Sequence, residues 1–160
     1  MRYLSLSELI YINGTLLNNP HITSGKRHVR DIDLLEAAVQ RPAASAFGQD
    51  AYPTLREKTA ALLHSIARNH PFADGNKRTA TVGAIFMLAV NGERVIWQPE
   101  AALTTILHVA EGVVHVPELA AWFPLEVQPA SMLPDADADM RHIARIIEEQ
   151  RWLLDELERR

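Results

Sequence analysis

An uninterrupted apolar run, Val82 to Val90, is the feature that most constrains how this chain can fold. It follows polar residues that begin at Asn76, and it ends at Asn91-Gly92, a pair typical of a helix C-terminus. A helix that is apolar on every side belongs in the interior of a protein. The run is about half as long as a helix that crosses a bilayer. The sequence therefore predicts a buried helix over residues 76–91, with the rest of the domain packed around it.

Amphipathic patterns predict further helices on both sides of this segment. Ser5–Glu8 and Thr54–Glu57 each fit the capping box that opens a helix. Pro71 pushes its predecessor out of the helical region, so the helix that starts after Thr54 should end at His70. Apolar stripes and terminal signals place the other helices at residues 6–17, 34–39, 99–111 and 117–123.

Strand signals are few and short, at Glu93–Trp97 and Ala46–Tyr52. We therefore expect an all-α fold with a small β-hairpin. Residues 1–123 form the predicted domain. Prolines and aspartates interrupted by alanines over residues 124–139 indicate a linker, and an amphipathic C-terminal helix is expected over residues 140–160.

Composition limits the classes of function. The 160 residues carry a formal net charge of −4, so no overall positive field attracts nucleic acid, and direct nucleic-acid binding is not expected. The absence of cysteine excludes thiolate nucleophiles and cysteine-bound metals, and it suits a reducing compartment. Because the sequence has no bilayer-length apolar run and no signal-peptide pattern, we expect a soluble cytoplasmic protein with no membrane partner.

Two cations at the start of the buried helix give the strongest indication of function. Lys77 and Arg78 occupy the first turn, where they oppose the positive end of the helix dipole at about 0.3 to 1 kcal/mol each. A bound phosphate would offset this repulsion, because the free amides, the dipole and both cations would act on the same group. Solvation of both side chains in an exposed first turn is the alternative.

Five neighbouring residues add to the case for a phosphate site. His70 is of the residue type that most often serves as a general base, although a histidine also suits the end of a helix. Asp74 could bind Mg²⁺ or cap the following helix. Gly75 allows a ligand to approach the backbone, Asn76 can donate or accept hydrogen bonds, and Phe72 should anchor the loop in the core.

The segment His70–Arg78 resembles the Fic/Doc family motif HxFx[D/E]GN[G/K]R, and it is more similar to the Doc (death on curing) branch than to the Fic branch. The resemblance extends over most of residues 1–123 and implies that they form a Fic/Doc-like catalytic domain. It includes Arg41–Pro53, where the family has a flap that aligns the target segment, although a plain helix connection is the alternative reading. The resemblance implies that His70 is the general base and that Asp74 holds Mg²⁺ on ATP. The residues that would bind the phosphates are Gly75, Asn76, Lys77 and Arg78.

The resemblance also implies which part of ATP is transferred. Members that transfer AMP have glycine at the position of Lys77 and a second arginine at the position of Thr81, whereas Doc-like members have lysine and lack that arginine. This chain is therefore expected to be a protein kinase. It would be the toxin of a type II toxin–antitoxin system that phosphorylates a translation factor such as elongation factor Tu and so inhibits translation. Adenylylation at the same site and a catalytically silent binding module are the alternatives.

The expected C-terminal helix raises the question of how the activity of this protein is restrained. Its apolar positions, spaced four and three residues apart, could pack on the domain, pair with a second copy or cover the active site. Fic-type proteins are often restrained by a helix bearing [S/T]xxxE[G/N], and this pattern does not occur here. Leu107 stands four residues before Glu111-Gly112, and Glu148 and Glu149 lack the required flanking residues. We therefore expect restraint by a separate Phd-like antitoxin.

Overall fold

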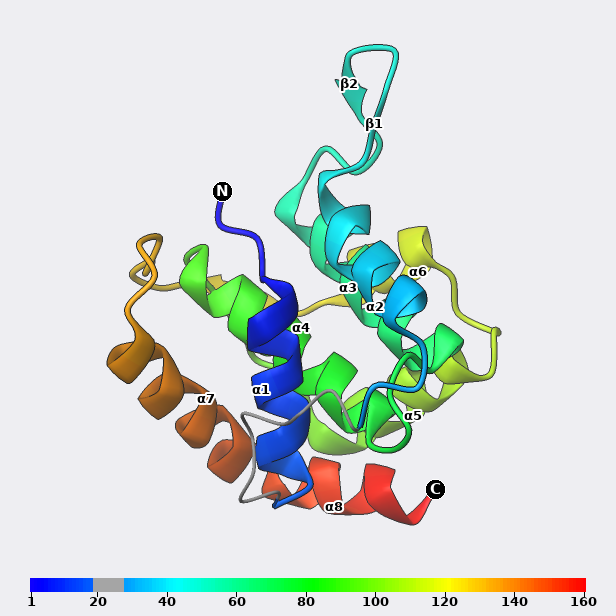
Figure 1. Ribbon diagram of the computed structural model, residues 1–160, viewed down its shortest axis with the longest axis vertical. Helices are drawn as coiled ribbons and strands as arrows, with labels where there is room; N and C mark the ends of the chain where they lie inside the picture. The colour runs from blue at the N-terminus through cyan, green and yellow to red at the C-terminus, as the bar shows by residue number, and fades with distance from the viewer. Residues whose placement is uncertain (19–27) are drawn as a thin grey trace.

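The computed structural model describes residues 1–18 and 28–160, which fold into helices with two small two-stranded antiparallel sheets (Figure 1). The expected all-α fold is confirmed. The helices are α1 (Leu6–Leu16), α2 (Ile32–Gln40), α3 (Leu55–Asn69), α4 (Asn76–Val90), α5 (Pro99–Ala110), α6 (Val116–Trp122), α7 (Ala136–Glu149) and α8 (Arg151–Arg159). A short 3-10 turn, η2 (Arg41–Ala43), and the strands β1 (Ser45–Ala46), β2 (Gln49–Asp50), β3 (Glu93–Val95) and β4 (Leu125–Val127) complete the described elements.

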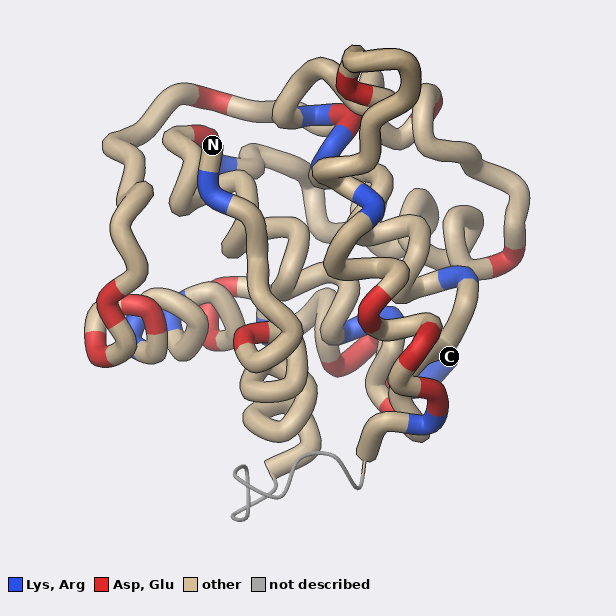
Figure 2. The backbone as a smooth tube through the Cα atoms, turned by 45° about the horizontal axis from the view of Figure 1, so that its top comes forward, with Lys and Arg blue, Asp and Glu red and all other residues tan. Residues whose placement is uncertain are grey.

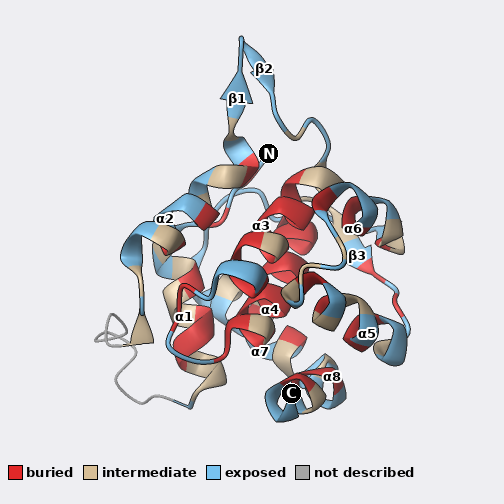
Figure 3. Ribbon diagram, turned by 90° about the vertical axis from the view of Figure 1, so that its right-hand side faces the viewer, coloured by how far each residue is buried: buried red, intermediate tan, exposed pale blue. Residues whose placement is uncertain are grey.

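Helix α4 is the centre of the molecule, as its sequence predicts. Every residue from Arg78 to Val90 is buried, and α4 packs against α1, α3, α5, α7 and α8. Figure 3 shows buried residues concentrated in α3 and α4, with exposed residues on the surrounding helices. Burial of an all-apolar helix by five neighbours gives the fold one continuous core.

The local signals of the sequence set the helix ends. Ser5 and Glu8 form a complete capping box at the start of α1, and the Thr54 hydroxyl accepts a hydrogen bond from the backbone N–H of Glu57 at the start of α3. Helix α3 ends before Pro71, with His70 as its C-terminal cap. The chain then turns directly into α4, so that these two long helices lie side by side.

The two small sheets differ in part from the expected strands. Residues 46–52 were expected to form one strand, but they belong to a tight hairpin of β1 and β2. Phe47 and Gly48, which connect these two strands, both have left-handed backbones (φ 55° and 75°). Strand β3 pairs with β4, with Val95 opposite Leu125. Strand β4 lies in the segment expected to be a linker, because its backbone finds hydrogen-bond partners along β3 that no local pattern reveals.

The C-terminal extension is two helices rather than the single helix expected over residues 140–160. The chain bends at Gln150 (φ −101°, ψ 18°), so that α7 packs on α4 while α8 turns to pack on α4 and α5. The bend allows one apolar seam to follow the curved surface of the core. Its buried members are Ile143, Ile146, Leu153, Leu154 and Leu157. The seam that suggested pairing with a second copy is therefore used within the chain.

Arg2 ties this extension to the N-terminal part of the molecule. Its side chain is buried, at 6% exposure, and donates hydrogen bonds to Glu8 (2.7 Å), to Asp139 (2.7 and 3.3 Å) and to the carbonyl oxygen of Ser131 (3.0 Å). Burial alone would lower the pKa of Arg2, but its hydrogen bonds to Asp139 and Glu8 outweigh burial, so the pKa is raised. The two carboxylates thus hold a permanent buried cation.

Candidate active site

The seven residues singled out in the sequence lie in the loop between α3 and α4 and in the first turn of α4, and the backbone of the loop is unusual at both ends. His70 has a left-handed conformation (φ 52°), and so does Gly75 (φ 74°), which is the N-cap of α4. A left-handed histidine persists only where its surroundings enforce it. Hence the position of His70 depends on what holds the loop.

The segment that precedes α2 holds the first half of the loop. The Arg30 side chain donates hydrogen bonds to the carbonyl oxygens of His70 (2.7 Å) and Asn69 (3.0 Å), at the negative end of the α3 dipole. The backbone N–H groups of Arg30 and Asp31 both donate to the carbonyl oxygen of Pro71 (2.8 and 3.0 Å). Sequence reasoning missed Arg30, because nothing in its neighbourhood indicates that it meets the end of α3.

Asn76 braces the loop from within. Its side-chain Oδ1 accepts a hydrogen bond from the backbone N–H of Phe72 (2.9 Å), and its Nδ2 donates to the carbonyl oxygen of the same residue (2.9 Å). The Phe72 ring is fully buried in the core. The Asn76 side chain therefore fixes the shape of the loop, and its second Nδ2 hydrogen and its backbone N–H at the start of α4 remain for a ligand.

Helix α1 holds the second half of the loop. Buried Asn13 donates from Nδ2 to the carbonyl oxygen of Asp74 (2.9 Å) and to the hydroxyl of Thr79 (3.0 Å). A Cβ at position 75 would lie 3.4 Å from Asn13 Nδ2, 3.4 Å from Leu17 Cδ2 and 3.5 Å from Arg78 Nη2. These are ordinary van der Waals distances, so glycine is favoured here by its left-handed backbone rather than by lack of space. Asn13 was not identified as a site residue from the sequence, because the helical pattern around it gives no sign of this role.

Asp74 does not cap α4, although this was one of the two roles that the sequence suggested for it. Its Oδ1 accepts a hydrogen bond only from the adjacent backbone N–H of Gly75 (2.8 Å), and Gly75 itself is the N-cap. The Asp74 side chain is 76% exposed, and its Oδ2 lies 3.8 Å from Arg78 Nη2. An accessible carboxylate beside two cations suits Mg²⁺, which takes one or two carboxylates and completes its shell with water and phosphate oxygens.

Arg78 is buried, at 7% exposure, yet its charge is only loosely matched. Its Nη2 lies 3.8 Å from Asp74, its Nη1 lies 3.7 Å from Glu158, and no hydrogen bond among the described residues uses its guanidinium. Neighbouring Lys77 is partly buried and forms no ion pair within the described part of the chain. Two cations with unused donors therefore stand at the positive end of α4, which is the arrangement of an anion site.

These residues line a pocket of about 350 Å³ that α8 closes from one side. His70 and the residues from Asp74 to Arg78 form its floor, and Leu157, Glu158 and Arg160 form the facing wall. Figure 2 shows acidic and basic positions close together near the C-terminus of the chain. Of the three destinations considered for the C-terminal helix, the structure shows packing on the domain, and the end of α8 lines one side of the pocket without enclosing it. Glu158 was not anticipated as a member of the site.

The arrangement combines a histidine, a carboxylate and two cations around one small volume. No cluster of three or more metal-ligating side chains occurs among residues 1–18 and 28–160, so Asp74 is the sole carboxylate that the motif loop offers to a metal. None of the helices in those two ranges has the length and apolarity needed to cross a membrane. The pocket can bind a phosphorylated ligand at the start of α4 and present it to His70.

Comparison with known proteins agrees with the motif. The model of the Fic/DOC family matches residues 3–88. The chain is 57% identical over 68 residues to Toxin Doc of Mycolicibacterium smegmatis, a match that covers 42% of this chain and 52% of that protein, so the chain spans about half the length of this relative. It is 32% identical over 120 residues to Protein kinase doc of Escherichia phage P1, covering 75% of this chain and 91% of that protein.

Proposed function

Because this chain belongs to the Fic/DOC family, we propose that it is the toxin of a toxin–antitoxin pair and that it phosphorylates a target protein with ATP. The observation that carries the proposal is the buried guanidinium of Arg78, which has unused donors at the N-terminus of α4 beside His70. A terminal phosphate would satisfy those donors. The name of the phage P1 relative supports the choice of kinase.

The proposed roles follow from the positions of the side chains. Lys77, Arg78 and the free backbone N–H groups at the start of α4 bind the phosphates. His70, exposed on the edge of the pocket, accepts the proton of the target hydroxyl as its oxygen forms a bond to the γ-phosphorus. The bond from that phosphorus to the bridging oxygen breaks, and ADP leaves. Asp74 would hold Mg²⁺, which neutralises phosphate charge when bound.

The surroundings of Thr81 favour phosphoryl over adenylyl transfer. Thr81 is completely buried, and its hydroxyl donates to the carbonyl oxygen of Lys77 (2.7 Å). An arginine at this position would have to displace core atoms, so the chain has no room for the second arginine of AMP-transferring members. A variant intended to transfer AMP instead of phosphate should therefore carry Lys77→Gly alone. Adding Thr81→Arg would disrupt the core.

The target and the partner follow from the resemblance to Doc proteins. We propose a translation factor such as elongation factor Tu as the phosphorylated protein, and a Phd-like antitoxin as the partner that restrains the toxin. A hydroxyl-bearing segment of the target would have to reach His70 past α8, since Leu157 and Glu158 flank the pocket.

Mass spectrometry tests the reaction. The purified protein is incubated with Mg²⁺, ATP and a cell lysate, and the lysate proteins are analysed for the added mass of a phosphoryl or an adenylyl group. We expect phosphorylation that is lost with His70→Ala and retained with His108→Ala, a matched histidine exposed on α5. Addition of an adenylyl group would replace the kinase assignment with the adenylyltransferase, and no modification by folded protein would support a silent binding module.

A further inference from the structure

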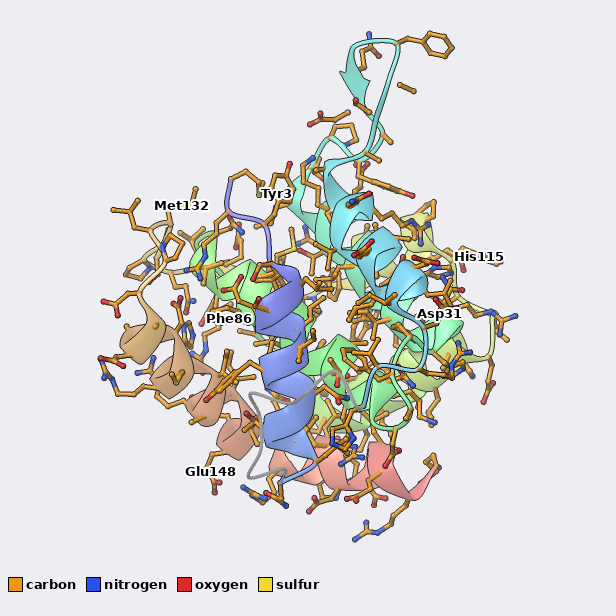
Figure 4. All side chains as sticks on the ribbon, in the orientation of Figure 1. Tyr3, Asp31, Phe86, His115, Met132 and Glu148 are labelled. Carbon is orange, nitrogen blue, oxygen red and sulfur yellow. The ribbon has the colours of Figure 1, made fainter. Side chains whose placement is uncertain are left out.

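A second, larger pocket lies at the other end of α3 and includes none of the residues that the proposed reaction assigns to ATP or to the proton transfer. It has a volume of about 690 Å³. Its walls come from η2, from residues 51–54 between β2 and α3, from the outer face of α3, and from α6. In Figure 1 the β1–β2 hairpin lies at the top of the molecule and α8, which flanks the first pocket, at the bottom. Figure 4 shows His115, at the start of α6, far from Glu148 of α7.

Arg41 lies in this pocket without a carboxylate partner. Its Nε donates a hydrogen bond to the hydroxyl of Tyr52 (2.9 Å), and its Nη1 donates to Ser65 Oγ (2.9 Å) and lies 3.0 Å from His64 Nδ1. All three partners are neutral when His64 accepts this bond at Nδ1, which places the imidazole proton on Nε2. The guanidinium also stacks over the Tyr52 ring, 5.5 Å from its centroid. Its geometry is fixed, whereas its charge is not neutralised by any described residue.

Arg56 has the same character on the other side of the pocket. Its Nη1 donates to the carbonyl oxygens of Ala120 (3.2 Å) and Phe123 (2.6 Å), at the C-terminal end of α6. No ion pair among residues 1–18 and 28–160 includes Arg56. Arg56 and His64 are eight residues apart on α3, or about 12 Å along the helix axis, so they bracket the length of the pocket.

The balance of charge in the pocket is positive. Burial lowers the pKa of His64, and the charges of Arg41, His115 and Arg68 lower it further. Glu57 is the one acidic residue in the lining, and it accepts a hydrogen bond from the Thr54 hydroxyl (3.1 Å) at the start of α3. Two arginines thus face one glutamate that is already engaged at a helix cap.

The remaining wall is apolar. It is formed by four residues of α6 and by Ala51, which follows β2. The residues of α6 are Val116, Pro117, Ala120 and Ala121. A pocket with few fixed polar groups and a broad apolar wall is the usual form of a small-molecule site. Uncompensated arginines at such a wall select a ligand that has both an anionic head and an apolar body.

We propose that this pocket binds a small organic anion, with its carboxylate or phosphate head on the Arg41 guanidinium and its apolar body along α6 towards Arg56. The donors left for the head are Arg41 Nη2 and the Nε2–H of His64, because the other Arg41 nitrogens are already bound. The site is separate from the pocket proposed to bind ATP, since the two pockets share no lining residue.

Binding of defined probes tests this assignment. Isothermal titration calorimetry on the full chain uses 3-phenylpropionate and phenyl phosphate as anionic probes, and 3-phenylpropionamide as a neutral probe of the same shape. We expect both anions to bind more tightly than the amide by about tenfold or more. The preferred anion identifies the head group. Equal binding of the anions and the amide, or no binding of either anion, overturns the proposal.

Variants locate the binding. Arg41→Gln and Ala121→Phe should each weaken the anions by about tenfold or more, the first by removing the charge and the second by filling the apolar wall. Ala121 is exposed and tolerates substitution, so it decides the question if Arg41→Gln unfolds. Arg94→Gln, on β3 and 58% exposed, is the matched control. Unchanged affinity in both pocket variants, or loss of probe binding with Arg78→Met, would assign the probes to another site.

Discussion

Arg2 and Arg78 are buried to nearly the same extent, at 6% and 7% exposure, and yet their surroundings differ completely. Arg2 donates four hydrogen bonds, three of them to carboxylates and none longer than 3.3 Å. Arg78 has only two carboxylates at 3.7 and 3.8 Å and no hydrogen bond among the described residues. Burial therefore does not distinguish a structural arginine from a binding one, whereas the use of its donors does.

The physical reason lies in desolvation. A buried charge loses its hydration, and the loss is made good only when its donors find new partners. Arg2 has found them within the chain. Arg78 stands at the positive end of α4, which adds repulsion, so a ligand with several negative oxygens would relieve both deficits. The comparison thus favours a structural role for Arg2 and supports the proposal that Arg78 binds phosphate.

The largest expected effect is on stability. Arg2→Met should lower the free energy of unfolding by about 3 kcal/mol, because Glu8 and Asp139 would remain partly buried without their cation. The same substitution at Arg78 should change it by less than about 1 kcal/mol, since its ion pairs are long and their carboxylates exposed. Urea denaturation measures both. Equal losses in the two variants would break the comparison.

The next effect is on binding. Arg78→Met should weaken binding of Mg²⁺-ATP by about tenfold to a hundredfold, because a buried charged hydrogen-bond donor is removed. Calorimetry on the full chain measures the affinity. Arg94→Met, in which an exposed arginine of β3 is removed, provides the control. A folded Arg78→Met protein that binds the nucleotide as the parent does would remove Arg78 from the site.

A smaller effect is expected at the partner of Arg78. Glu158→Gln should strengthen Mg²⁺-ATP binding by about twofold to fivefold, because the Glu158 carboxylate competes with phosphate for Arg78. Glu126→Gln is the control, as Glu126 pairs with exposed Arg94 across the β3–β4 sheet. Weaker nucleotide binding in Glu158→Gln would show that Glu158 supports the site rather than competing in it.

The smallest effect is a pH dependence of stability that originates at Arg2. Burial would raise the pKa of Asp139, but hydrogen bonds from Arg2 and from the backbone N–H of Asp135 outweigh burial, so the pKa is lowered. A carboxyl whose pKa is lower in the folded state contributes stability above its unfolded pKa, near pH 4, and loses it as the pH falls through the folded value. Asp139→Asn should therefore flatten the decline of the urea midpoint between about pH 5 and about pH 2. An unchanged slope would mean that the Arg2 pair contributes nothing through Asp139.

The sequence predicted the core of the fold well, because its signals are local. An all-apolar run, a capping box and a proline each act within a few residues, and α1, α3 and α4 begin or end where those signals lie. The C-terminal extension was less predictable. The bend at Gln150 and the strand β4 depend on the shape of a surface made by α4, α5 and β3.

The same division applies to the candidate site. The motif from His70 to Arg78 is contiguous, so the sequence alone brings its residues together. The residues that position or oppose it come from distant segments: Asn13 from α1, Arg30 from before α2 and Glu158 from α8. No local pattern distinguishes these three from ordinary surface or core residues.

By itself, the sequence determined that a histidine, a carboxylate and two cations lie close to the start of a buried helix, because all four fall within nine consecutive residues, His70 to Arg78. Only the tertiary structure decided that the Arg2 guanidinium is saturated while that of Arg78 is not. Saturation depends on which groups the packed helices bring within hydrogen-bond distance, and that distance is a property of the assembled fold.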